Sequence, residues 1–415
     1  MQINSLHSPT KFLTDFLGEI PLKNELIKYE KWWNETGFSI STLTDRMGTP
    51  GLKMFDRFGK RIDKILYTDE YWTMLHKGYE TGIIAEVFKK NSLIPFYLLG
   101  YQTAFYDPGL FCPYTVSLST AVPLHKYAAT SVKDIFFPNM LKKNKYVWQG
   151  ATWMTEAGGG SDLGSFVETT AVKSGNKWIL NGEKYFSSNA GADLAVVAAK
   201  PEGAANNVKG LALFLLPKFK SDGSLNYQIR RLKDKIATIS VPTGEVEFIN
   251  SEAYLLGKQD WGIYLILEVL NISRTANSIA SISVAQRAIY EAYKFAKDRI
   301  AFGKPIFEHA LLVKQFEDKI QQLHQALALA WEAVILLNEV WEDCPPYTEK
   351  YHLFRLVAHL SKYWTAEFAV QTAKWAMEVN GGMGTLHEFP VERWLREAMI
   401  LSIWEGTPHR QILDG

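Results

Sequence analysis

The sequence feature that most constrains the fold is one long helical pattern in the second half of the chain. Its apolar residues recur at alternating steps of three and four, and they are Val313, Phe316, Ile320, Leu323, Leu327, Ala330, Val334, Leu337 and Trp341. This spacing places a single apolar seam along one helix of about 29 residues. Residues 263–301 and 347–377 carry helical patterns of similar length. Because so long a seam needs other helices to cover it, we predict a helical bundle in this part of the chain.

The first 150 residues read mainly as helices joined by loops. Residues 22–34 and 69–87 mix apolar and charged residues at helical spacing, and residues 93–101 are more uniformly apolar, which predicts burial. Residues 56–61 (Asp-Arg-Phe-Gly-Lys-Arg) form a local charge cluster, which we interpret as a solvated turn. The prolines are expected to break this region into short pieces; they are Pro95, Pro108, Pro113 and Pro123.

Segments that favour strands begin near residue 150, and a Ser-Gly-Asn turn at residues 174–176 predicts a hairpin. The segments are residues 167–172, 177–187, 194–199, 211–216 and 244–249. A basic patch in the same region is interpreted as a solvated loop; it consists of Arg230, Arg231, Lys233 and Lys235. We therefore predict a mainly α fold with a central β domain (α+β). Its parts are an N-terminal helical domain at residues 1–149, a middle β domain at 150–257 and a C-terminal helical bundle at 258–415.

Composition excludes several classes of function. The net charge is +1, which gives no electrostatic case for binding nucleic acid or an anionic membrane. Cys112 and Cys344 lie far apart, and His352 and His359 lack a third ligand, so no metal site is expected. No apolar run approaches the ~20 residues of a membrane span, and residues 1–10 lack the apolar core of a signal peptide. These features predict a cytoplasmic protein.

Two stretches have the residues for chemistry. Residues 154–162 (Met-Thr-Glu-Ala-Gly-Gly-Gly-Ser-Asp) form a glycine-rich loop, and such loops expose backbone N–H groups to an anionic or planar ligand. The loop lacks the G-x-G-x-x-G spacing of a dinucleotide fingerprint. The second stretch is an apolar run, residues 398–404, that ends at Glu405 and is followed by Gly406 and Pro408, which stop a helix. A poorly solvated carboxylate has a raised pKa, which makes it a usable base near neutral pH.

Five motifs in order resemble those of the acyl-CoA dehydrogenase family. Residues 154–162 are similar to its Thr-Glu-x-x-x-Gly-Ser-Asp signature, with Ala157 where many members have Pro. The others resemble the family's Asn-Gly-x-Lys strand, its Arg-x-x-Phe-Gly segment, and its closing Gly-Gly-x-Gly and Tyr-Glu-Gly-Thr elements; they are residues 181–189, 299–305, 381–384 and 403–407. The resemblance covers residues 150–410. It implies a helical domain, a β-barrel-like domain and a four-helix bundle, assembled as a homotetramer.

The resemblance implies FAD as the cofactor. The residues that match flavin contacts are Met154, Thr155, Gly160, Ser161, Phe186 and Ser188. Arg299 and Phe302 match the segment that reaches the FAD pyrophosphate of a neighbouring subunit, and Glu378 and Gly382 belong to the Gly-Gly element. Thr407 and, more loosely, His409 match cofactor contacts near the base.

The resemblance also implies α,β-dehydrogenation of an acyl-CoA thioester. This reaction needs a base for the α-proton and an acceptor for the β-hydride, and flavin N5 is that acceptor in the family because no side chain accepts a hydride well. Glu405 matches the base, and its backbone N–H would help to polarise the thioester carbonyl. Some members carry the base on an earlier helix, but Ser273 stands at that position and cannot serve. Arg274 and Asn271 match substrate contacts; Asn271 replaces an Asp that holds CoA in many members, which argues against the standard binding mode.

Residues 56–63 and 112–115, together with Trp404 and Glu378, resemble the AidB-like branch, which is linked to the adaptive response to alkylation. Members of that branch usually carry a long helical extension tied to DNA binding, and this chain ends at Gly415, so DNA binding is expected to be weak. The expected partners are an acyl-CoA or related thioester and an electron-transfer flavoprotein or another electron acceptor. Three alternatives remain open: an AidB-like flavoprotein that binds nucleic acid or damaged bases, an acyl-CoA oxidase that passes electrons to oxygen, and a non-catalytic scaffold.

Overall fold

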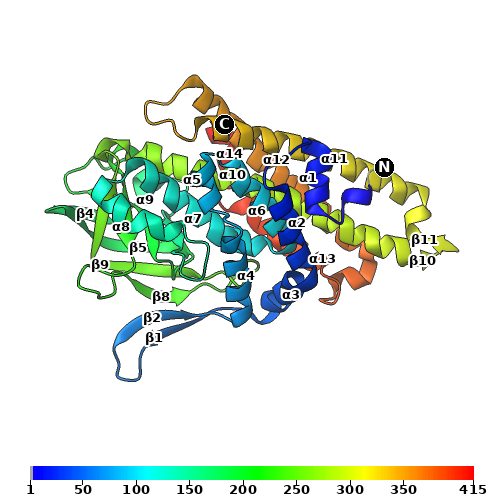
Figure 1. Cartoon of the computed structure of the whole chain (residues 1–415), viewed down its shortest axis with the longest axis horizontal. Helices are drawn as coiled ribbons and strands as arrows, with labels where there is room; N and C mark the ends of the chain where they lie inside the picture. Colours follow the sequence, from blue (N-terminus) through cyan, green and yellow to red (C-terminus); the bar gives the residue numbers. More distant parts are fainter. Residues whose placement is uncertain (1–2) are drawn as a thin grey trace.

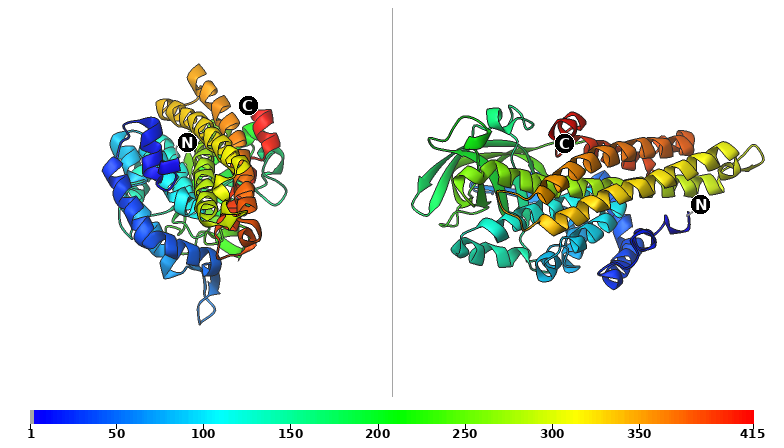
Figure 2. Two further views of the ribbon diagram at one scale, coloured as in Figure 1. Left: turned by 90° about the vertical axis from the view of Figure 1, so that its right-hand side faces the viewer. Right: turned by 90° about the horizontal axis from the view of Figure 1, so that it is seen from above.

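The computed structural model describes residues 3–415, and its elements follow one another as helices, strands and long helices (Figure 1). The β strands lie at one end of the molecule, and the long C-terminal helices extend toward the other end (Figure 2). The predicted fold class, mainly α with a central β region, is confirmed. None of the helices within residues 3–415 is long and apolar enough to cross a membrane.

Helices α6 and α7 form the buried centre of the N-terminal region, and nearly every residue of α6 is buried. The predicted breaks are confirmed at Pro95 and Pro108, which stand at the starts of α6 and α7. They are wrong at Pro113 and Pro123, which lie inside α7, one helix of 20 residues. A proline costs an interior helix one hydrogen bond, but α7 packs along α6, α10 and the sheet, and this burial outweighs the loss. The helices are α1 (Pro9–Leu17), α2 (Lys23–Trp32), α3 (Phe38–Met47), α4 (Asp69–Glu80), α5 (Ala85–Lys90), α6 (Ile94–Tyr106), α7 (Pro108–Tyr127) and α8 (Thr130–Met140).

A separate hairpin projects from this region, formed by β1 (Gly51–Phe55) and β2 (Arg61–Leu66) (Figure 1). The turn predicted over its tip is confirmed: the Asp56 carboxylate accepts from the amides of Phe58 and Lys60. The two strands themselves were not predicted. Both strands are short and carry charged residues, with Lys53 in β1 and Arg61, Asp63 and Lys64 in β2, which hides the strand pattern.

The strands of the middle region pair in a closed circuit, from β6 to β4, β5, β9, β7 and back to β6. This closure makes the region barrel-like, with β6 and β7 buried along nearly their whole length. Two strands were missed: β3, which pairs parallel to β6, and β8, which contains Arg230 and Arg231 of the basic patch predicted to be a loop. The elements are β3 (Gly150–Trp153), α9 (Leu163–Phe166), β4 (Thr170–Ser174), β5 (Lys177–Ser188), β6 (Leu194–Pro201), β7 (Ala212–Pro217), β8 (Gln228–Leu232) and β9 (Thr243–Leu256).

Long antiparallel helices make up the C-terminal region, and α12 packs against α10, α11 and α13. The predicted seam of α11 is confirmed, since its residues from Phe316 to Leu337 are buried. The glycines of residues 381–384 form a short 3₁₀ turn, η6 (Gly381–Thr385), at the end of α12. The elements are α10 (Gly262–Asp298), β10 (Ile300–Ala301), β11 (Lys304–Pro305), α11 (Ala310–Val340), α12 (Glu349–Asn380), α13 (Val391–Ile403) and α14 (Pro408–Asp414).

Candidate functional site

The glycine-rich loop is held against strand β5 by a buried ion pair between Glu156 and Lys184. Lys184 Nζ lies 2.6 Å from Glu156 Oε1 and donates to the Met154 carbonyl at 3.2 Å. Glu156 also accepts from the Thr169 hydroxyl at 2.6 Å. Burial raises the pKa of Glu156, but Lys184 and these bonds outweigh it and hold the pKa below its usual value. Burial lowers the pKa of Lys184 to about 8 despite its partner, so the pair anchors the loop without exposing a charge.

This anchor brings together the loop and the end of β5. The Tyr185 amide donates to the Thr155 carbonyl at 2.9 Å, so the next residues of the strand lie beside the loop. Phe186 and Ser188 share one face of β5, and Phe186 leaves 57% of its surface exposed. A Cβ on Gly160 would lie 2.7 Å from the Thr155 hydroxyl, so only glycine keeps that hydroxyl accessible. Met154 is buried and Ser161 is exposed on the same loop.

Glu405 lies just after the end of α13, as the apolar run followed by Gly and Pro predicted. Its backbone has φ 57°, and Gly406 follows with φ 106°. Such left-handed geometry is uncommon for a residue with a side chain. The side chain is half-buried, and Arg274 Nε donates to its main-chain carbonyl at 3.1 Å.

The surroundings of Glu405 make it a stronger base than a solvated carboxylate. Burial raises the pKa of its carboxyl above the ordinary value, while the positive charges of Arg274 and Lys362 act in the opposite direction. Cys112 of α7 is close enough for the Glu405 charge to help raise the pKa of its thiol, though burial is the main cause. Glu405 therefore lies among helices α7, α10 and α12.

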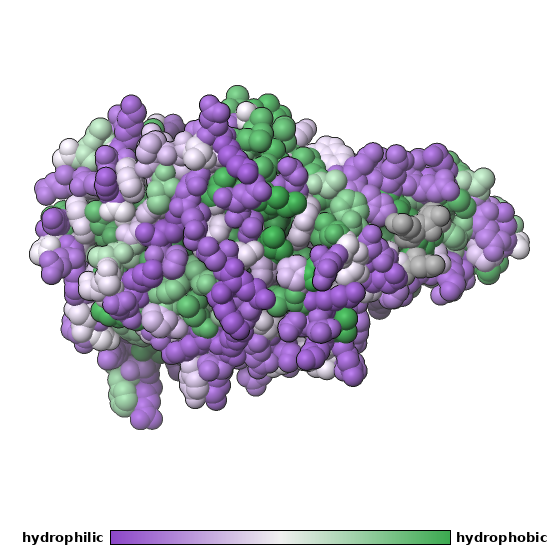
Figure 3. Space-filling view, turned by 45° about the horizontal axis from the view of Figure 1, so that its top comes forward, coloured by the Kyte–Doolittle hydropathy of each residue, from purple (hydrophilic) through white to green (hydrophobic). Residues whose placement is uncertain are grey.

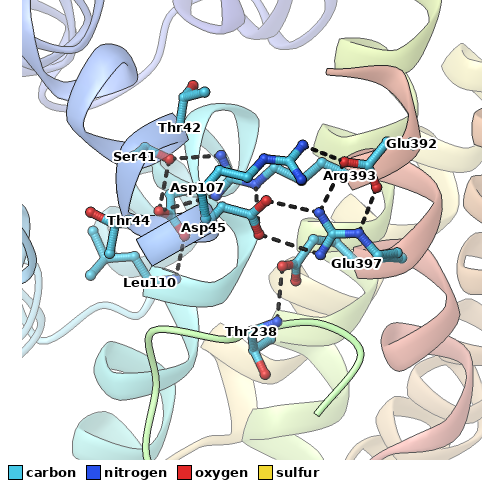
Figure 4. Close-up of polar contacts among 12 residues, drawn as sticks. Ser41, Thr42, Thr44, Asp45, Asp107, Leu110, Thr238, Glu392, Arg393 and Glu397 are labelled. Carbon is cyan, nitrogen blue, oxygen red and sulfur yellow. Dashed lines mark hydrogen bonds and ion pairs between the residues drawn. The ribbon is translucent and has the colours of Figure 1, made fainter. Parts of the chain in front are cut away.

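A buried network of charges fixes α13, the helix that ends before Glu405 (Figure 4). Arg396 lies 2.8 Å from Asp45 of α3, and Arg393 lies 3.2 Å from Asp107 at the start of α7. Glu397 accepts from the amide of Thr238, in the segment between β8 and β9, at 2.9 Å. Burial raises the pKa of Glu397 to about 7, although Arg393 opposes the rise. The network joins α13 to the N-terminal helices and to the β region.

Asn271 and Arg274 lie together on α10, facing α12. Asn271 Oδ1 accepts from Arg274 at 2.9 Å, but Asn271 Nδ2 is buried without a partner among the described residues. Arg355 Nε of α12 is also buried and unpartnered among the described residues. Burial lowers the pKa of Arg274, and the positive charge of Arg355 contributes to the decrease. Two guanidinium groups and an unsatisfied amide therefore lie near one another, and Arg274 links them to Glu405.

Four predicted cofactor residues lie far from the glycine-rich loop of their own chain. Arg299 and Phe302 lie at the β10–β11 hairpin, at the end of the bundle opposite the sheet (Figure 1). Phe302 is 96% exposed, with φ 52°. Glu378, which pairs with Lys374, and the exposed Gly382 lie where α12 ends. The chain itself does not bring these four residues to the loop.

Thr407 and His409 lie beside Glu405, at the start of α14. The pKa of Asp162, in the glycine-rich loop, is lowered mainly by hydrogen bonds with Ser165 and, to a smaller extent, by the charge of Arg410 on α14. The glycine-rich loop and α14 therefore lie near each other. Sequence reasoning missed Lys184, Lys362 and Gln411. Lys184 could have been found, since it stands in the same motif as Phe186, whereas the other two carry no local signal.

The basic patch at residues 230–235 is neutralised by its neighbours. Arg230 pairs with Glu183 and Glu247, while Arg231 and Lys233 share Glu245. Lys235 is half-buried, donates to the Val241 carbonyl at 2.8 Å and has a pKa lowered by burial to about 8. No group of three or more potential metal ligands occurs within residues 3–415.

Family models match three successive parts of the chain. "Adaptive response protein AidB N-terminal domain" matches residues 28–146, "Acyl-CoA dehydrogenase, middle domain" matches residues 151–251, and "Acyl-CoA dehydrogenase, C-terminal domain" matches residues 260–414.

Individual relatives share most of the chain. Acyl-CoA dehydrogenase family member 11 of Caenorhabditis elegans is 27% identical over 99% of this chain and 70% of its own length. AidB of Escherichia coli is 27% identical over 88% of this chain and 68% of its own length. The crystal structure of C. elegans ACDH-11 in complex with C11-CoA superimposes with a TM-score of 0.87 at 25% identity, covering 99% of this chain and 72% of that one. The three family models match the N-terminal, middle and C-terminal regions in this order. This chain therefore belongs to the acyl-CoA dehydrogenase family and has an AidB-type N-terminal domain.

Proposed function

We propose that the protein is an FAD-dependent oxidoreductase that removes hydrogen from the Cα–Cβ bond of an acyl-CoA thioester, with Glu405 as the α-proton base. The observation that carries this proposal is the half-buried Glu405 carboxyl, whose pKa burial raises. A base is most effective when its pKa approaches the working pH. Ser273 occupies the alternative base position of the family and cannot take a proton.

The loop and strand end fit FAD. The exposed face of Phe186 offers a flat apolar surface beside Ser188, and Gly160 keeps the Thr155 hydroxyl accessible. Met154, Thr155, Gly160, Ser161, Phe186 and Ser188 would hold the flavin, with Thr407 and His409 near its other side. FAD, when bound, supplies the hydride acceptor that no side chain provides. The residues of the chain hold and orient the substrate and take its α-proton.

A thioester with a phosphorylated carrier fits the groups around Arg274. The buried Arg274 and the neighbouring Arg355 can pair with anionic oxygens, and Asn271 Nδ2 still needs an acceptor. Asn271 has no negative charge, and Asp414 lies 3.9 Å from Arg274, so part of the positive charge of Arg274 and Arg355 remains for an anionic ligand. The C. elegans relative was solved with C11-CoA, which supports an acyl-CoA as the substrate class.

The visible spectrum of the purified protein tests the proposal first. We expect a yellow protein that releases FAD in acid and whose flavin is bleached anaerobically by acyl-CoAs of some chain length. Release of FMN, or no flavin after reconstitution, would contradict the cofactor. A bound flavin that no acyl-CoA in a broad panel reduces would contradict the dehydrogenase reaction. Turnover in air compared with turnover with an electron-transfer flavoprotein separates an oxidase from a dehydrogenase.

We also propose a homotetramer. Exposed apolar side chains follow one face of α12 and continue onto α14, and hydrophobic side chains gather near the top of the view in Figure 3. They include Leu353, Leu356, Leu360, Trp364, Ile412 and Leu413. Contiguous apolar surface of this kind typically marks a protein interface. Light scattering that finds a monomer with tightly bound FAD would contradict the assembly.

A nucleic-acid role is the second candidate, favoured by the match to the AidB N-terminal domain at residues 28–146. Against it, three of the four cations of the basic patch pair with carboxylates, and the fourth, Lys235, is half-buried and donates to the Val241 carbonyl. We expect weak binding to duplex DNA at physiological salt. Submicromolar affinity with a steep salt dependence would favour this role over the dehydrogenase. The cytoplasm is the proposed compartment.

A further inference from the structure

The backbone at Glu405 adopts a left-handed conformation, which is unfavourable for a residue with a side chain. Glu405 has φ 57°, a left-handed geometry that costs a residue with a side chain roughly 1–3 kcal/mol. A cost of this size persists only where the surroundings hold the chain. Because the direction of the carboxyl depends on this backbone, whatever holds the backbone also positions the base.

Three side chains from three helices hold the two carbonyls of this turn. Arg274 Nε of α10 and Gln411 Nε2 of α14 each donate to the Glu405 carbonyl at 3.1 Å. Gln411 Nε2 also donates to the Gly406 carbonyl at 3.0 Å. Lys362 Nζ of α12 donates to the Gly406 carbonyl at 2.6 Å and to the Ser402 carbonyl at 3.1 Å. The approach is close, since a Cβ on Gly406 would lie 2.4 Å from Gln411 Nε2.

The amide of Gln411 is oriented by His359. His359 Nδ1 lies 2.8 Å from Gln411 Oε1, and this contact requires a proton on Nδ1 because the amide oxygen only accepts. The amide nitrogen is thereby directed toward the turn. His359 Nε2 lies 3.5 Å from a nitrogen of Arg274, which only donates, so Nε2 is the acceptor. Burial and the Arg274 charge lower the pKa of His359 to about 4, which keeps the ring neutral near physiological pH.

We propose that Lys362 and Gln411, with Gln411 oriented by His359, are positioning residues that hold the Glu405 turn, and that the Lys362 charge favours the ionised form of the Glu405 carboxyl. The proposal rests on the proposed role of Glu405 as the base. Lys362 is 1% exposed and has no carboxylate partner within hydrogen-bond distance in the described part of the chain. Its two hydrogen bonds are both with backbone carbonyls, Ser402 at the end of α13 and Gly406 in the turn.

The charged groups around the turn fix the sign of the pH effect. Lys362 faces Glu405 and Arg274, and burial lowers its pKa to about 7. Glu405 faces Arg274 from α10, Lys362 from α12 and the Cys112 thiol from α7. From α14, Arg410 and Asp414 act on Arg274. A neighbouring positive charge favours a carboxylate, so removing the Lys362 charge raises the pKa of Glu405 and moves the base form to higher pH.

Hydrogen exchange without substrate tests the positioning role directly. In Lys362→Met and in Gln411→Ala, we expect the backbone amides within residues 402–408, where Pro408 has none, to exchange about tenfold faster than in the wild-type holoenzyme, because the turn loses donors. The matched control is Lys350→Met, an exposed lysine on the same helix that pairs with Glu339; its exchange should stay at the wild-type rate. Unchanged exchange at residues 402–408 in both test variants would overturn the proposal.

Reaction kinetics test the charge. Lys362→Met leaves the Ser402 carbonyl without its side-chain donor and the Gly406 carbonyl with Gln411 alone, so Lys362→Arg, which keeps both charge and donors, is the second variant. In Lys362→Met we expect the pH profile of flavin reduction to shift upward by roughly 1 unit, with kcat reduced more than the KM changes, whereas Lys362→Arg should restore the profile. A profile that stays fixed in Lys362→Met would overturn the charge effect. If no acyl-CoA reduces the wild-type flavin, the proposed function fails, while the exchange experiment still decides the positioning role.

Discussion

The two ends of the C-terminal bundle differ in how completely one chain builds them. Near Arg274, the Glu405 turn is enclosed by donors from α10, α12 and α14. At the other end, Phe302 is 96% exposed and Glu378 pairs with Lys374 of its own helix. Under the proposed assembly, one chain builds the end at Glu405 by itself, whereas the residues of the far end would contribute to a site on a second copy.

The largest expected effect is on the catalytic end. Glu405→Gln keeps the shape of the side chain but cannot accept a proton, so flavin reduction should slow by roughly 10²–10⁴-fold. FAD content and melting temperature should match the wild type. Stopped-flow reduction by a working acyl-CoA measures the effect, with Glu388→Gln, an exposed carboxylate at the far end, as control. Equal loss in both variants would remove the distinction between the ends.

The next prediction tests whether the Glu156–Lys184 ion pair, which holds the glycine-rich loop against β5, is needed for stability and FAD retention. Lys184→Met leaves the buried Glu156 without its counter-charge, which should lower the free energy of unfolding by roughly 3–5 kcal/mol. FAD retention should fall as well, because the loop is no longer fixed to β5. Thermal melting measures the effect. Lys177→Met, at the partly exposed start of the same strand, should cost less than about 1 kcal/mol; equal losses would contradict the anchor.

A smaller effect is expected at the far end. Arg299→Ala should weaken FAD retention by roughly tenfold to a hundredfold, because a charge-assisted hydrogen bond is lost. Mixing refolded Arg299→Ala and Glu405→Gln chains sharpens the comparison. Each proposed site combines Glu405 of one chain with Arg299 of the other, so in a mixed dimer one site carries both substitutions and the other carries neither. Since about half of the dimers in a random mixture are mixed, about a quarter of the wild-type activity should be recovered. Recovery of no activity from mixed dimers would show that the site is not shared in this way.

The smallest effect concerns the network behind α13. Because burial raises the pKa of Glu397 to about 7, the native state binds a proton that the unfolded state has already lost above about pH 4.3. Native stability should therefore fall as the pH rises from about 4.3 to about 7. Glu397→Gln removes this dependence, so its melting temperature should gain a few degrees on the wild type between pH 5 and pH 8. A constant difference across this range would exclude the titration.

Sequence reasoning succeeded where a local pattern carries the information. The period of the apolar residues fixed α11, because a continuous seam has one helical solution. Gly406 and Pro408 likewise predicted the end of a helix, and in the structure α13 ends at Ile403 and α14 begins at Pro408. The β1–β2 strands and the uninterrupted α7 were missed. Charged residues disfavour strands and prolines disfavour helix interiors, but these are local preferences, and tertiary burial outweighed both.

The site was predicted in its parts but not in its contacts. The motif residues were placed by resemblance, and their roles remain predictions. Lys362 and Gln411 could not have been found from spacing, because they lie on α12 and α14 and meet only when the helices pack. His359 was set aside as a metal ligand for want of a third ligand, and its observed neighbours are Gln411 and Arg274.

The length of α10 links the two ends of the bundle. Arg274 and Asp298 are 24 positions apart on this one helix, which corresponds to a span of roughly 36 Å at about 1.5 Å per residue. One residue inserted between them would rotate everything that follows by about 100° around the helix axis and turn Arg299 away from its target. Loops such as residues 341–348 absorb insertions at little cost. Related chains are therefore expected to differ freely in loop length while inheriting this interval unchanged.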